Sequence, residues 1–215
     1  MPRARRRAAA RRRCLDHAAD HQRQHQCRDD HDRRESRRTD PHHRMSAAAA
    51  YDFQHIAVER PAPGVVLLTL NRPERMNATN DVLHSELVRL PAAIDADPGA
   101  RAAVVTGAGR AFCVGGDWAD IAGQGNDYAN KIRMMRETSQ ILTGLIEMRK
   151  PLVSAINGPA AGIGLALGLL ADISVANEEA NLSDGHLRIG LAAGDHAAMV
   201  WPLLCSMAKA KRYLL

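Results

Sequence analysis

The sequence predicts an α/β domain preceded by a basic tail. Short apolar runs of strand length alternate with longer segments of helical periodicity, as expected for strands joined by helices. Two glycine-bearing junctions between an apolar run and a helical segment recur, at 115–117 and at 162–164. Hydrophobic residues make up 46% of the 215 residues, which is enough to build a core.

Residues 1–44 differ from the rest of the chain in composition. They hold fourteen arginines and seven acidic residues and almost no apolar residue beyond alanine, so we expect this tail to be disordered. These charges give the tail +7, and since the whole chain carries +5, residues 45–215 carry −2. The tail could bind nucleic acid or act as a transit peptide, although its acidic residues argue against the latter. A third alternative is that Met45 is the natural start and the tail is not native.

The expected elements follow the hydrophobic pattern. Strands are expected at residues 53–59, 65–70, 102–106, 152–156, 173–176 and 181–183. Helices are expected from Thr79 or Asn80 to residue 96, briefly from Asp117 or Trp118, over 126–149, from Gly162, over 197–204 and from about Ser206. Pro91 lies inside the first of these helices and predicts a kink or an early end.

The rest of the chain is organised around the uncharged stretch from Pro151 to Ala171. An apolar run, 152–156, is followed by the turn signal Asn157-Gly158-Pro159 and then by a helical segment of small and apolar residues. Such a strand–turn–helix directs backbone N–H groups at whatever lies before the helix, either an anion or an oxyanion. One alternative is a membrane span, which Ser154, Asn157, Pro159 and four glycines disfavour. The other is a purely structural core element.

Two glycine junctions could each supply one N–H group to the same oxygen, as the developing oxyanion of a thioester reaction requires. The four cysteines have no CxxC spacing, so we expect a reducing, cytoplasmic environment. The histidines of the tail lack the spacing of a zinc finger, and we expect no metal site.

Three segments resemble the signatures of the crotonase family, the enoyl-CoA hydratase/isomerase superfamily. They are LNRPERMNA (70–78), AFCVGGD (111–117) and INGPAAGIG (156–164), and the resemblance extends from about Phe53 to Leu215. It implies a crotonase-like spiral of ββα units that assembles as a homotrimer or hexamer when full length. Family members continue into further helices that cover the acyl pocket, so residues 45–215 are expected to be a C-terminally incomplete acyl-CoA domain.

The resemblance also implies roles for individual residues. The backbone N–H groups of Gly116 and Ile163 would form the oxyanion hole for an acyl-CoA thioester. The segment Arg75-Met76-Asn77-Ala78 would contact the adenine and phosphates of coenzyme A, and Asp117 follows the first donor. Coenzyme A would enter as part of the substrate, with no further cofactor.

The acid/base positions depart from the family. The two glutamates of its hydratases are replaced by Ala166 and His186, which leaves His186 or Asp195 to move a proton. We therefore expect an enzyme that stabilises a thioester enolate, of isomerase type or otherwise unlike a two-glutamate hydratase. The alternative is a non-catalytic acyl-CoA binder or an inactive fragment.

Each candidate also has a structural interpretation. His186 could be a hydrogen-bonded structural histidine, and Asp195 could cap the following helix. Asp184 is expected to be a turn residue, and Cys113 a small core residue.

Overall fold

The computed structural model describes residues 51–117, 119, 127–190, 192–193 and 196–215. The chain divides at Met45 and Ser46 into two units, and every described residue belongs to the second. The expectations for the tail, for the short helix near Trp118 and for Asp195 fall outside the described residues.

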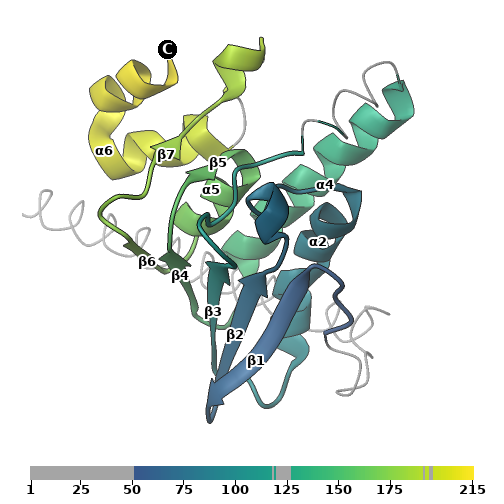
Figure 1. Ribbon diagram of the computed structural model, residues 1–215. Helices are drawn as coiled ribbons and strands as arrows, with labels where there is room; N and C mark the ends of the chain where they lie inside the picture. Colours follow the sequence, from purple (N-terminus) through teal and green to yellow (C-terminus); the bar gives the residue numbers. More distant parts are fainter. Residues whose placement is uncertain (1–50, 118, 120–126, 191, 194–195) are drawn as a thin grey trace, which may run out of the picture. The chain divides into compact units, whose positions relative to one another are not determined.

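A five-stranded sheet confirms the predicted α/β class (Figure 1). Its strand order is β1-β2-β3-β4-β6; β1 and β2 are antiparallel, and all other neighbours are parallel. The strands are β1 (Ile56–Ala62), β2 (Val65–Leu70), β3 (Ala102–Gly107), β4 (Leu152–Ile156) and β6 (Ile173–Ala176). Alternate residues of β2, β3 and β4 are buried, and they join the residues of the helices in one hydrophobic core.

Strand β1 begins later than expected and runs on through Pro61 to Ala62. The backbone N–H groups of Gln54 and His55 donate to the carboxylate of Glu86, while the His55 carbonyl accepts from the Asn71 N–H at 2.8 Å, so a side chain takes the N–H groups of this segment. Pro61 is accommodated because β1 lies at the edge of the sheet, where a missing donor is tolerated.

The helices are α2 (Asp81–Ala96), α4 (Tyr128–Glu147), α5 (Gly162–Leu169) and α6 (His196–Leu214). Helix α2 begins as predicted, with the Asn80 side chain accepting from the Leu83 N–H at 3.0 Å. Of the two outcomes expected at Pro91, a kink or an early end, the early end is wrong, because the helix continues to Ala96, as expected from its hydrophobic pattern, with Leu87, Leu90 and Ile94 buried on its inner face. In α6, Ser206 is non-helical at φ 70°, which separates two helical stretches as the sequence indicates.

A second, two-stranded sheet consists of β5 (Ala160–Ala161) and β7 (Leu182–Ser183), which run parallel. The long uncharged stretch therefore divides into β4, β5 and α5. Among the described residues, no helix is both long enough and apolar enough to cross a bilayer.

Removing the cap of α2 tests its start. Asn80→Ala leaves the Leu83 N–H without its acceptor, and we expect the free energy of unfolding in urea to fall by about 1 kcal/mol. Asn80→Asp, which keeps a capping oxygen, should stay close to the parent protein. Equal losses in the two variants would contradict the cap.

Candidate active site

The loop between β2 and α2 is fixed from within by Asn77. Its side chain is fully buried; the amide nitrogen donates to the carbonyls of Ala108 and Ala111, both at 2.9 Å, and the amide oxygen accepts from the Arg72 N–H. Met76 and Asn77 both adopt left-handed backbone conformations, at φ 51° and 56°, after the short helix η3 (Pro73–Arg75). The side chain of Asn77 thus holds the loop in shape and faces the protein interior.

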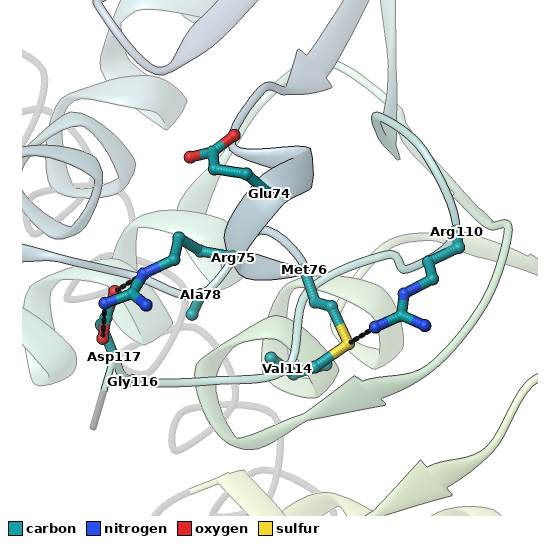
Figure 2. Close-up of a pocket in the computed structure, with 8 residues that line it drawn as sticks. All are labelled: Glu74, Arg75, Met76, Ala78, Arg110, Val114, Gly116 and Asp117. Atoms are coloured by element: carbon teal, nitrogen blue, oxygen red, sulfur yellow. Dashed lines mark hydrogen bonds and ion pairs between the residues drawn. The ribbon is translucent and has the colours of Figure 1, made fainter. Parts of the chain in front are cut away.

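A pocket of about 450 Å³ opens beside this loop (Figure 2). It includes most of the residues predicted to contact coenzyme A, together with one predicted oxyanion donor. The lining residues are Glu74, Arg75, Met76, Ala78, Arg110, Val114, Gly116 and Asp117. Figure 2 shows Arg75 directed at Asp117, and the Arg110 guanidinium, which the sequence analysis did not single out, next to the Met76 sulfur at 3.5 Å. Arg75 and Arg110 therefore bring two positive charges to one pocket.

Asp117 is a buried carboxylate held by two arginines. Its oxygens lie 3.3 Å from the guanidinium groups of both Arg72 and Arg75, and 3.1 Å from the Ala119 N–H. Burial acts to raise the pKa of Asp117, but the Ala119 N–H and the two guanidinium groups outweigh it and lower the pKa below its usual range. Asp117 is consequently an anion at neutral pH, immediately after Gly116.

The backbone at Gly115 reverses the direction of its hydrogen bonds. The Val114 N–H donates to the carbonyl of Met76. The carbonyl of the next residue, Gly115, accepts from the Thr79 N–H at 2.7 Å, so Val114 and Gly115 both face the segment that contains Met76 and Thr79. Consecutive residues of a regular strand point to opposite sides, and the positive φ of Gly115, 90°, produces the exception. In the parallel bridge between Thr79 and Gly116, Thr79 bonds to Gly115 and Asp117, the residues on either side of Gly116. The N–H of Gly116 itself therefore points away from Thr79.

That edge is the one along which the second glycine junction runs. Cys113 pairs in parallel with Ala160: the Cys113 N–H donates to Pro159, and the Ala161 N–H donates to Cys113 at 2.9 Å. Two residues further along each strand lie Gly115 and Gly162, and a Cβ placed on Gly115 would come within 3.7 Å of the Gly162 Cα. The structure therefore brings together the junctions that carry Gly116 and Ile163.

Ile163 lies in the first turn of α5, where backbone N–H groups have no acceptor within the helix. The preceding Ala161 provides no side-chain cap, and the helix dipole favours a negative oxygen at this end. Ile163 is 9% exposed and does not line the pocket beside Arg75. Helix α5 packs closely against Cys113 at Gly164, where a Cβ would lie 2.3 Å from the Cys113 carbonyl oxygen. Only glycine allows this approach.

Of the acid/base candidates, His186 is described, and it does not line that pocket. His186 opens the short helix η4 (His186–Ile189) just after β7, and its Nδ1 makes a short hydrogen bond to Asp184. The expectation that Asp184 is a turn residue missed this partnership, in which the Asp184 side chain is only 2% exposed. Ala166 is fully buried in α5 and brings no acid to the site.

Cys113 is fully buried, and burial raises the pKa of its thiol to about 11, although the Gly115 backbone and Arg72 act to lower it. It is a core residue, as the sequence indicates. Within the described part of the chain, no group of three or more His, Cys, Asp or Glu side chains could hold a metal ion.

Comparison with known proteins agrees with this architecture. The sequence model of the family described as enoyl-CoA hydratase/isomerase matches residues 60–215. The chain belongs to this family. It is 34% identical to the 1,2-epoxyphenylacetyl-CoA isomerase of Escherichia coli over 68% of the chain and 57% of that protein. It is 41% identical to a mevalonyl-coenzyme A hydratase of Beauveria bassiana over 62% of the chain and 50% of that protein.

Solved structures of the family share the fold. An enoyl-CoA hydratase/isomerase from Mycobacterium paratuberculosis superimposes with a TM-score of 0.73 at 42% identity, over 77% of this chain and 66% of that one. A putative enoyl-CoA hydratase from Streptomyces coelicolor gives a TM-score of 0.73 at 34% identity, over 80% and 63%. The chain spans only about half of the length of these curated relatives. It covers 66% and 63% of these two structures.

The close packing of α5 can be tested at Gly164. Gly164→Ala forces a Cβ against the Cys113 carbonyl, and we expect it to lower the free energy of unfolding by about 1–3 kcal/mol or more. Gly185→Ala is the matched control, because a Cβ there meets nothing within 4 Å; its change should stay within about 0.5 kcal/mol. A Gly164→Ala variant as stable as the control would contradict this packing.

Asp117 predicts a pH dependence of stability. Its pKa is lower in the folded than in the unfolded chain, so its stabilisation is present above the unfolded value of 3.8 and is lost as the pH falls through the folded value. Asp117→Asn should lower the free energy of unfolding at pH 7 by about 1–3 kcal/mol and flatten its decline below about pH 4. The exposed Asp52→Asn should do neither. An unchanged acid profile in Asp117→Asn would show that another carboxylate dominates.

Proposed function

We propose that this chain belongs to an enzyme that transforms acyl-CoA thioesters by stabilising an enolate. The observation that supports it most is the close approach of the Gly115–Gly116 and Gly162–Ile163 junctions. From it we infer that the N–H groups of Gly116 and Ile163 donate to a common region. Two such donors match the two lone pairs of an enolate or tetrahedral oxyanion, whereas a ground-state carbonyl needs them less.

The pocket beside Arg75 suits the coenzyme A part of the substrate. Arg75 and Arg110 would attract its phosphates, and Met76 with Ala78 offers apolar surface to the adenine. Asn77 would act indirectly, since its buried side chain shapes the loop that carries these groups. Coenzyme A enters as part of the substrate in this proposal, with no other cofactor.

The type of reaction follows from the acid/base groups. With Ala166 and His186 in place of the two glutamates, we infer a proton shift of isomerase type rather than addition of water by two carboxylates. Abstraction of an α-proton by His186 or Asp195 sends the C–H electron pair into the thioester enolate, and return of the proton to another carbon completes an isomerisation. The relatives named above include both an isomerase and a hydratase of CoA thioesters, which supports the substrate class.

Assembly as a homotrimer or hexamer remains part of the proposal. The exposed apolar side chains of α6, among which Leu203 is 82% exposed, support a contact with another subunit.

The decisive experiment compares two substitutions at one donor. Gly116→Pro removes the N–H group and Gly116→Ala keeps it, and the φ of Gly116 is not in the left-handed region that favours glycine. With a panel of CoA thioesters in deuterated water, the parent protein should exchange α-protons. Gly116→Pro should exchange about 10²–10³-fold more slowly, the usual cost of one oxyanion donor.

Binding of the same thioesters, followed by calorimetry, separates the enzyme from the non-catalytic binder. Binding without exchange in the parent protein would favour the binder. Full exchange by a correctly folded Gly116→Pro protein would exclude Gly116 as a donor.

A further inference from the structure

The structure pairs His186 with a carboxylate two residues before it. Nδ1 of His186 makes a short hydrogen bond to Oδ1 of Asp184, and the Asp184 side chain is only 2% exposed. The His186 side chain is 19% exposed, so the imidazole lies between the buried carboxylate and the surface. A buried carboxylate is expensive unless it is paired or hydrogen-bonded, which makes this contact a fixed feature of the fold.

The strand pairing puts the two residues beside the candidate oxyanion site. Strand β7 runs parallel to β5, with Ser183 opposite Ala161. Asp184 is the residue that follows β7, and Gly162, then Ile163, follow β5 at the start of α5. Neighbouring parallel strands are about 4.8 Å apart. Asp184 and His186 therefore follow a strand that lies next to the one leading to the candidate donor Ile163.

A carboxylate on one ring nitrogen decides what the other can do. An Nδ1–H group that donates to Asp184 leaves Nε2 as the basic nitrogen of the ring, and the carboxylate stabilises the imidazolium formed when Nε2 takes a proton. Replacing Asp184 by Asn would remove the carboxylate that favours the Nδ1–H tautomer and would weaken the hold on the ring.

We propose that Asp184 is the positioning residue for His186 as the base of this site, an inference that rests on the proposed function. The α-proton of the thioester passes to Nε2 of His186, and the C–H electron pair moves into the enolate. Asp184 keeps its charge throughout, holds the ring orientation and stabilises the imidazolium. The pair would thus supply, from the end of β7, proton-transfer chemistry that the two glutamates supply in the family's hydratases.

The test is a double-mutant cycle on α-proton exchange. Asp184→Asn should slow exchange by about 10²-fold, within the range for general acid–base catalysis, while thioester binding stays within about threefold of the parent protein. In the background of His186→Ala, the same substitution should have almost no further effect, because Asp184 acts only through the imidazole. Asp95→Asn, which removes a carboxylate bound to Arg149 elsewhere in the fold, should leave exchange unchanged.

Nitrogen NMR of the histidine side chains supplies a readout that does not depend on turnover. His186, assigned by its loss in His186→Ala, should show the Nδ1–H tautomer in the parent protein and a mixture in Asp184→Asn. Equal losses from Asp184→Asn with and without His186, or an unchanged tautomer, would overturn the positioning role.

The outcomes also separate this inference from the proposed function. Exchange that depends on Gly116 and is unaffected by Asp184→Asn would overturn the positioning role alone. Absence of exchange with every thioester would overturn the proposed function and with it this role, whatever the tautomer.

Discussion

The site depends on contacts between backbone segments that lie too close together to admit any side chain between them. A Cβ would lie 2.3 Å from the Cys113 carbonyl oxygen at Gly164, 2.2 Å from that of Arg110 at Gly158 and 2.3 Å from that of Ala111 at Gly107. These contacts bring the ends of β3 and β4 and the start of α5 against the segment 110–115. The convergence of the two junctions thus depends on glycines at a few positions, and the neighbours of Gly158 and Gly164 lie about fifty residues earlier in the sequence.

Ion pairs and hydrogen bonds then hold in place the segments that the glycines bring together. Arg72 reaches both Asp117 and the carbonyl of Ala78, so one side chain ties the loop before α2 to the residue after Gly116. Thr79 adds two backbone hydrogen bonds across the same gap. A donor held in this way needs no rearrangement when negative charge develops in front of it, and that is the condition under which a backbone N–H group contributes most to catalysis.

The limits of the sequence follow from the range of the interactions involved. Helix α2 and strand β4 were predictable because a local cap, a local hydrophobic period and flanking turns define them. The start of β1 was not, because Glu86, more than thirty residues away, takes the N–H groups that strand pairing would use. Strand β5 has only two residues and no period to detect, so its pairing with β7 was not predictable. The motifs named Gly116 and Ile163, but their convergence is a property of the fold.

The absence of an acid on α5 bears on the chemistry that this site can support. Ala166 is fully buried one turn from Ile163, so this helix contributes a backbone donor and apolar packing but no proton acceptor. On the proposed function, proton transfer has to come from a group outside α5, and the end of β7, whose strand pairs with the one leading into α5, carries an imidazole on a buried carboxylate. A single base can remove a proton and return it to another carbon, whereas hydration needs separate groups to activate water and to protonate carbon. The proposed isomerisation therefore requires only one base outside α5, whereas the addition of water would require a second group.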